Sequence, residues 1–192
     1  VTDRFINIAS QRNAGVDVTG SVRHNFGRGG TLNFLASMTF QTKDEFALFA
    51  DTGEDNNGEV GSPKFVGDFN LTWTSQNKKW TAFYGVDVIG KSSSKNELLE
   101  ANGGEECIDS TLRGLYCPKV NTPLVTYHSA SLTREFENFD ITMGVSNIFD
   151  RKPPRVSVLN GGTIAMLGAS PAVSQYDYLG RRAFINVTAR FK

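Results

Sequence analysis

Apolar and polar residues alternate along most of this chain. In residues 16–23, for example, Val16, Val18 and Val22 alternate with polar residues such as Asp17. A period of two places successive side chains on opposite faces of a β-strand. The same pattern predicts seven strands, at residues 16–23, 32–41, 65–74, 80–89, 124–136, 139–149 and 183–191. No segment shows a comparable helical period, so the chain is predicted to be all-β.

The connections between these strands alternate in length. Short turns are predicted at residues 27–30, 75–78 and 137–138, and long loops at about 42–64, 90–121 and 150–182. Short turns at one end and long loops at the other are typical of transmembrane β-barrels of the outer-membrane type. A soluble sandwich or up-and-down barrel can alternate in the same way. Six aromatic residues beside the short turns favour the membrane barrel, where they would form an interfacial girdle: Phe26, Trp73, Trp80, Phe136, Phe139 and Phe191.

The surrounding solvent decides which face of such a sheet points outward. In lipid the apolar face must point outward, because an aqueous or protein-filled lumen is the only favourable place for charged side chains. The residues predicted to face the lumen are Asp17, Arg23, Asn33, Asp68, Asn70, Asp87, Asp140, Asn186 and Arg190. In this orientation the short turns are periplasmic and the long loops are extracellular.

Composition and charge exclude several classes of protein. The 192 residues contain 20 Lys+Arg and 20 Asp+Glu, so the formal net charge of 0 provides no general attraction for nucleic acid. No apolar run approaches the roughly 20 residues of a transmembrane helix. The chain begins at Val1 without a charged segment or an apolar signal core, so a mature protein or a piece of one is expected.

The cysteines and histidines carry different predictions. Cys107 and Cys117 lie in one long loop, which predicts a disulfide formed in an oxidising compartment; two reduced thiols are the alternative. His24 and His128 lie on different predicted strands with no nucleophile placed beside them. We therefore predict no catalytic residues, and no enzyme activity.

The loops carry the remaining candidate sites. Residues 51–59 are rich in oxygen ligands, but their spacing does not match an EF-hand, so a solvated loop is favoured over a calcium site, and no metal or cofactor is predicted. Three basic residues near Pro153 and Pro154 are candidates for binding an anionic substrate or lipopolysaccharide phosphates, with a solvated loop as the alternative: Arg151, Lys152 and Arg155. Three loop tyrosines would suit stacking on a ligand, but loop packing is the favoured role of each: Tyr116, Tyr176 and Tyr178.

Two motifs near the end of the chain resemble those of a known family. Asn147-Ile148-Phe149-Asp150, followed by Pro153 and Pro154, precedes the segment from Tyr178 to Phe184 that opens the last strand. Together they resemble the carboxyl end of a TonB-dependent outer-membrane receptor, and further likeness extends over nearly the whole chain. In that family the final strand carries an assembly signal ending on an aromatic residue, which corresponds here to Ile185, Val187, Ala189 and Phe191, although Lys192 follows.

The resemblance implies a 22-stranded barrel around an N-terminal plug, driven by the TonB complex of the inner membrane. Residues 1–192 are then expected to be a C-terminal part of that barrel, with the plug and upstream strands absent from this chain. The predicted partners are outer-membrane lipid and lipopolysaccharide, the rest of the barrel and its plug, the TonB complex and a scarce nutrient such as a siderophore, carbohydrate or peptide. The predicted location is the outer membrane of a Gram-negative bacterium. A passive porin-like barrel and a soluble secreted β-sandwich that binds a ligand are the alternatives.

Overall fold

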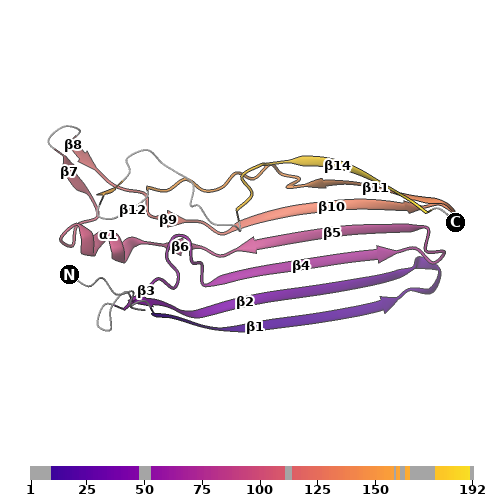
Figure 1. Ribbon diagram of the computed structural model, residues 1–192, viewed down its shortest axis with the longest axis horizontal. Coiled ribbons are helices and arrows are strands. Elements are labelled where there is room, and N and C mark those ends of the chain that lie inside the picture. The colour runs from indigo at the N-terminus through magenta and orange to yellow at the C-terminus, as the bar shows by residue number, and fades with distance from the viewer. Residues whose placement is uncertain are drawn as a thin grey trace, which may run out of the picture.

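The computed structural model describes residues 10–47, 53–110, 114–157, 159–160, 163–164 and 176–190. Within these residues, one antiparallel sheet holds seven strands in the order β1-β2-β4-β5-β10-β11-β14, and the short strand β3 (Glu54–Asp55) pairs with β2. The seven are β1 (Ser10–Asn25), β2 (Thr31–Ala47), β4 (Phe65–Thr74), β5 (Trp80–Ile89), β10 (Val125–Glu135), β11 (Phe139–Ser146) and β14 (Arg182–Ala189). Each strand therefore pairs with the next long strand along the chain, as the alternating pattern predicted (Figure 1). The sheet is open rather than closed into a barrel.

The register aligns apolar residues across the whole sheet. One row crosses all seven strands, in the order Val22, Phe34, Leu71, Tyr84, Ala130, Val145 and Ala183. Because side chains alternate between the two sides of a strand, this row and the parallel rows two residues away form one apolar face. The opposite side, the polar face, carries rows such as Thr19, Ser37, Asp68, Asp87 and Tyr127. The residues predicted to face a lumen therefore lie together on one side of the sheet, which confirms the predicted division of the faces.

The strands run between two different ends of the molecule, which we call the turn end and the loop end (Figure 1). At the turn end, the 3-10 turn η1 (Gly27–Gly29) joins β1 to β2. Gly30 follows it with a φ of 88°, and a Cβ at this position would lie 2.3 Å from the carbonyl oxygen of Thr74. Only glycine fits here, because a side chain would collide with the neighbouring strand.

The loop end contains short elements that the alternating pattern did not predict. They are β6 (Ser92–Ser93), α1 (Lys95–Ala101), β7 (Ile108–Ser110), β8 (Gly114–Tyr116), β9 (Asn121–Thr122), β12 (Leu159–Asn160) and β13 (Thr163–Ile164). The hairpin of β7 and β8 is bridged by the disulfide between Cys107 and Cys117, which confirms the predicted pairing. Helix α1 is seven residues long, too short to show a helical period in the sequence.

Strand β11 ends at Ser146, three residues before the predicted end. Asn147 and Asp150 adopt positive φ angles of 50° and 51°, and the amide of Asp150 donates to the carbonyl of Asn147. This turn takes the chain out of the sheet at the motif that begins with Asn147.

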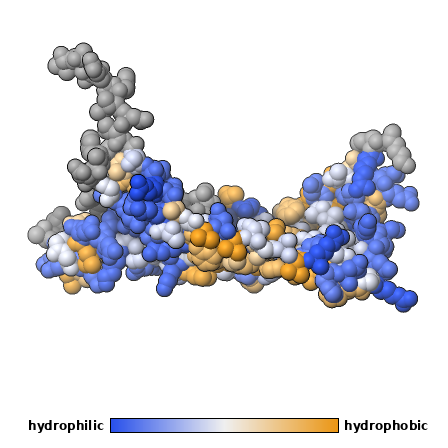
Figure 2. All heavy atoms as spheres, turned by 90° about the horizontal axis from the view of Figure 1, so that it is seen from below, coloured by the Kyte–Doolittle hydropathy of each residue, from blue (hydrophilic) through white to orange (hydrophobic). Residues whose placement is uncertain are grey.

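The buried core lies at the loop end, and the apolar face is exposed. Ile89, Val125, Tyr127 and Tyr176 form the cluster of buried residues. On the apolar face, by contrast, Ile185 is 70% exposed. Figure 2 shows apolar residues gathered along the middle of the molecule, between hydrophilic regions at its two ends. No helix among the described residues is long and apolar enough to cross a membrane.

Candidate functional site

The two family-like motifs meet at the loop end of the sheet. Asn147 is 2% exposed, and its amide nitrogen donates to Asp177 Oδ2 at 2.9 Å and to the carbonyl of Arg151 at 3.0 Å. Its side-chain oxygen accepts from the amide of Arg151 at 2.8 Å. Asn147 therefore uses both ends of its side chain to hold its own turn and to join a segment 30 residues further along.

Asp177 joins the same turn to the start of β14. Its Oδ1 accepts hydrogen bonds from the amides of Leu179 and Gly180, at 3.0 and 3.2 Å, and from Arg182 Nη1 at 2.9 Å. Burial raises the pKa of Asp177, but the hydrogen bonds from Asn147, Arg182 and the two amides together outweigh it, so the pKa lies below its usual value. The carboxylate is thus held in its charged form.

Asp150 completes this group of contacts. Its Oδ1 accepts from the amide of Arg181 at 2.9 Å and from Lys152 Nζ at 3.0 Å. The hydrogen bond from the Arg181 amide and then that from Lys152 lower the pKa of Asp150. Gly180, at a φ of 78°, lies so close that a Cβ would be 2.7 Å from Asp150 Oδ1. We call Asn147, Asp150, Asp177, Gly180 and Arg182 the loop-end cluster.

The other motif residues surround the cluster. The amide of Ile148 donates to the carbonyl of His128 at 2.8 Å, which ties the turn to β10. Phe149 is 69% exposed and its ring meets the His128 ring edge-on, with 5.0 Å between centroids. Pro153 is half-buried and Pro154 is buried. The motif therefore has a structural role at the junction of β10, β11 and β14.

Two of the three predicted tyrosines lie beside the cluster. A hollow of about 530 Å³ on the polar face, which we call the tyrosine hollow, is lined by Tyr127, Tyr176, Tyr178, Asp177 and Arg182, together with Asp87, Ser129, Ser146, Asn147 and Leu179. Tyr176 is buried in the core, whereas Tyr178 is 51% exposed. Burial raises the pKa of the Tyr176 hydroxyl. Tyr178 is thus the tyrosine in this hollow with the most surface free to contact a ligand.

Tyr116 does not line the tyrosine hollow. Its hydroxyl lies 2.8 Å from the hydroxyl of Ser157, so it joins the disulfide-bridged hairpin to the segment after Pro154. The Ser157 hydroxyl also accepts from the amide of Lys119 at 3.0 Å. Tyr116 therefore packs within the loops, the role that the sequence favoured.

The three predicted basic residues are all exposed. Lys152 is paired with Asp150, and within the described residues Arg151 and Arg155 form no ion pair. Two further arginines that the sequence placed in the motif lie at the same end. Arg182 is paired with Asp177 on the polar face, and Arg181 lies one residue earlier, on the side of the apolar face.

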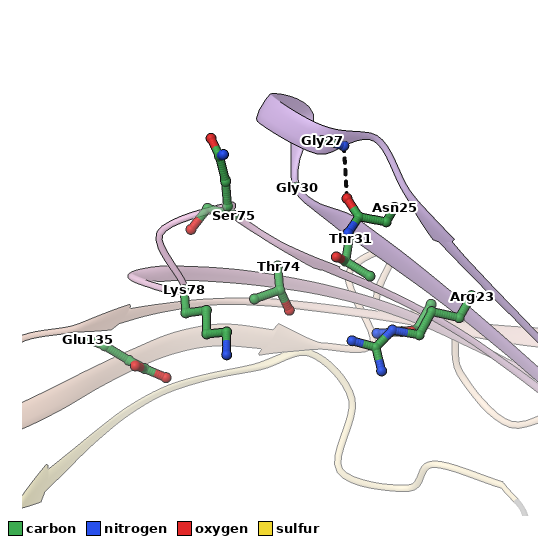
Figure 3. Close-up of a pocket in the computed structure, with 11 residues that line it drawn as sticks. Arg23, Asn25, Gly27, Gly30, Thr31, Thr74, Ser75, Lys78 and Glu135 are labelled. Carbon is green, nitrogen blue, oxygen red and sulfur yellow. Dashed lines mark hydrogen bonds between the residues drawn. The ribbon is translucent and has the colours of Figure 1, made fainter.

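A second polar hollow lies at the turn end. This turn-end hollow, of about 490 Å³, is lined by Arg23, Asn25, Gly27, Gly30, Thr31, Asn33, Thr74, Ser75, Gln76, Lys78 and Glu135. Figure 3 shows Arg23, Lys78 and Glu135 approaching it from three separate segments. The sequence predicted that Arg23 and Asn33 share the polar face, but the hollow as a whole could not be predicted, because its lining comes from four strands and two turns.

The middle of the polar face carries a pair of carboxylates. Asp68 and Asp87 lie directly opposite each other on β4 and β5, and Asn70 donates a hydrogen bond to Asp68. Both were predicted to share a face, but their juxtaposition depends on the register. Two carboxylates in this position give the centre of the polar face a negative charge.

The acidic loop predicted at residues 51–59 is described from residue 53 onward, and Asp51 and Thr52 lie outside the described residues. Asp55 Oδ1 accepts from the amides of Asp44 and Asn57, each at 3.1 Å, and these hydrogen bonds lower the pKa of Asp55. Burial, and then the nearby charge of Glu97, raise the pKa of Glu59. No group of three or more His, Cys, Asp or Glu side chains in the described part of the chain is arranged to hold a metal ion.

Aromatic side chains gather at the turn end, as the sequence predicted. Arg134 lies over the Trp80 ring, 4.4 Å from its centroid, and Phe136 stacks on Phe139 with 4.5 Å between centroids. Trp73 donates from Nε1 to the carbonyl of Gly29 at 2.8 Å. Phe191, the last member of the predicted girdle and of the predicted assembly signal, lies outside the described residues, whereas Ile185, Val187 and Ala189 lie on the apolar face of β14.

The two histidines lie far apart in the fold, at opposite ends of the sheet. His24 contacts Phe26 at the turn end, and His128 Nδ1 lies 2.7 Å from the Tyr84 hydroxyl on β5.

Comparison with known proteins identifies no relative: no family model, no curated protein and no solved structure matches this chain.

Proposed function

We propose that this chain is a segment of a transmembrane β-barrel in the outer membrane, belonging to a receptor for TonB-dependent uptake of a scarce nutrient. The observation that supports this proposal best is the apolar face. Apolar residues run in register across all seven strands, and no layer among the described residues covers them. A water-soluble protein would expose this face at a high cost in free energy, whereas lipid would cover it.

The dimensions of the strands agree with this proposal. A tilted strand needs about 9–11 residues to cross the hydrocarbon core, and β4, β5 and β10 have 10, 10 and 11 residues. Aromatic residues lie at the turn end, where a girdle would meet the headgroups. Closing the barrel would need further strands beside β1 and β14, whose outer edges pair with no described strand.

The assignment to active uptake rests on the resemblance carried by the two motifs. Their residues build the loop-end cluster, which joins the last two long strands just below the loops. The polar face beneath contains the tyrosine hollow, where Tyr178 and Arg182 offer a surface for a polar nutrient. In this proposal the chain supplies wall, lumen lining and loops, and it performs no covalent chemistry.

Two experiments test the location and the transport separately. The first experiment introduces one cysteine at a time into a variant that lacks Cys107 and Cys117. One cysteine replaces Val18 on the apolar face, and the other replaces Asp17 on the polar face. A maleimide confined to water should reach position 17 and miss position 18. Equal labelling of both positions, with the protein soluble without detergent, would favour the secreted sandwich instead.

The transport step is tested in cells that express the complete gene. Growth on a limiting nutrient that depends on this gene should also depend on an intact TonB complex. Gene-dependent uptake that persists without TonB would replace active transport with the passive porin-like barrel. The nutrient is found by comparing growth on siderophores, carbohydrates and peptides as limiting sources.

A further inference from the structure

The apolar face is not uniform, because it contains a groove near the loop end. The row formed by Ala130, Val145 and Ala183 carries small side chains. Two residues closer to the turn end, the next row carries the larger side chains of Leu132, Met143 and Ile185. The step from small to large side chains leaves a hollow of about 710 Å³, which we call the outer groove.

A positively charged side chain, that of Arg181, lies at the loop end of this groove. Arg181 lines it together with Ile148, and the residue that follows it by two, Ala183, belongs to the small row. Within the described residues Arg181 forms no ion pair, and its guanidinium has one hydrogen bond, at 3.5 Å, to the carbonyl of Ile148. The nearby Asp150 carboxylate instead accepts from the Arg181 amide and from Lys152.

We propose that the outer groove binds one acyl chain of an anionic lipid and that Arg181 binds the phosphate of its headgroup. This inference rests on the proposed membrane location, since lipid reaches the groove only if the sheet spans a bilayer. The choice of occupant follows from the chemistry of the two parts. The groove offers apolar contact to a hydrocarbon chain, and a guanidinium forms charge-assisted hydrogen bonds to phosphate oxygens.

The surroundings agree with a headgroup at this level. Phe149 and Leu179 are 69% and 79% exposed and belong to the segments beside Arg181, where apolar side chains would contact the boundary between headgroup and acyl chain. Arg151 adjoins Asp150 in the same turn and is exposed, so it adds positive charge near the same level. A neutral lipid would use the groove without using this charge.

The test uses protein from the complete gene, purified from membranes in mild detergent. Native mass spectrometry counts the phosphatidylglycerol or phosphatidylcholine molecules retained during titration with each lipid. Wild-type protein should retain one phosphatidylglycerol in preference to phosphatidylcholine. Arg181→Gln should weaken that retention about tenfold, the size expected for one charge-assisted hydrogen bond, and Arg181→Lys should keep most of it.

A second variant tests the groove without changing the charge. Val145→Phe fills the small row and should abolish selective retention. Val187→Phe makes the same substitution elsewhere on the apolar face of β14, and Arg28→Gln removes a cation at the turn end, so both should behave as wild type. A fold check by heat-modified migration on a gel accompanies each variant.

Each remaining outcome has a distinct meaning. If the protein inserts into membranes but the Arg181→Gln and Val145→Phe variants retain the lipid as strongly as their control variants do, the proposed lipid site is overturned. The proposed function would then remain intact. Competition by inorganic phosphate as strong as by the lipid would show a free-anion site, and would also overturn it. A protein that stays soluble without detergent would overturn the proposed membrane location itself.

Discussion

The sheet and the loop end of this molecule are stabilised in opposite ways. At the loop end, Val125 and Tyr127 are almost completely buried in one cluster with Tyr176, and a disulfide bridges the hairpin of β7 and β8. In the sheet, Val187 is 60% exposed on a face made of apolar residues. The loop end thus has a small buried core of its own, formed within the chain. The apolar face of the sheet has no such cover among the described residues, and this difference is the main support for the membrane location proposed above.

The largest predicted effect comes from the two outer edges of the sheet, on β1 and β14. If the sheet belongs to a larger barrel, residues 1–192 expressed alone leave the outer edges of β1 and β14 unpaired, and each unsatisfied group costs several kcal/mol in lipid. We expect the chain alone to aggregate and to form no heat-resistant monomer. Gel migration with and without boiling checks this, using the product of the complete gene as the control. A folded, membrane-inserted monomer from these residues alone would contradict the larger barrel.

Charge on the two faces tests the comparison within one strand. Val187→Arg on the apolar face should cost about 2–4 kcal/mol near the bilayer midplane, whereas Thr188→Arg on the polar face should cost much less. Phe69→Arg and Asn70→Arg form the same pair on β4, where Asn70 faces Asp68. Urea unfolding in phospholipid vesicles measures these free energies. Equal costs on both faces would argue for a soluble sandwich.

The disulfide should stabilise the loop end alone. Replacing Cys107 and Cys117 with serine should cost the loop about 2–3 kcal/mol in the chain-entropy account. Membrane insertion and the migration of the folded sheet should not change. Proteolysis of the loop, with and without reductant, checks the expectation, and reductant should have no effect on the serine variant. Two free thiols in the mass of the unreduced protein would refute the pairing.

The loop-end cluster couples the two regions and should show an intermediate effect. Asn147→Ala removes the buried donor to Asp177 Oδ2 and the bonds to Arg151, which should cost about 1–3 kcal/mol. The exposed Asn138→Ala at the turn end is the matched control. Urea midpoints of the two variants are compared with that of the wild type. A similar small loss in both would show that the cluster adds no stability.

The pH dependence of that cluster is the smallest expected effect. The pKa values of Asp150 and Asp177 are lowered in the folded state. Their contribution to folding stability is therefore complete above the unfolded-state pKa of about 3.9, and it is lost as the pH falls through the folded-state pKa values. Asp177→Asn should therefore be less stable than wild type at neutral pH and should converge with it below about pH 4. Unfolding titrations across this range check the convergence, with Asp109→Asn on the exposed hairpin as control. A constant difference at all pH values would exclude an ionic origin.

The sequence by itself determined the seven long strands, their faces and the disulfide. These features are local: the side of a strand that a residue occupies follows from a period of two, and Cys107 and Cys117 share one short hairpin. The helix α1 was missed for the same reason, since seven residues inside a long loop are too few to show a period.

Only the tertiary structure decided which distant residues meet. The bond between Asn147 and Asp177 joins segments 30 residues apart, and the pairing of Asp68 with Asp87 needs the register of β4 on β5. The outer groove likewise depends on three strands aligning Ala130, Val145 and Ala183 in one row. Such contacts depend on strand register and on the path of long loops. These are set by the free energy of the whole assembled sheet rather than by the residues next to each position.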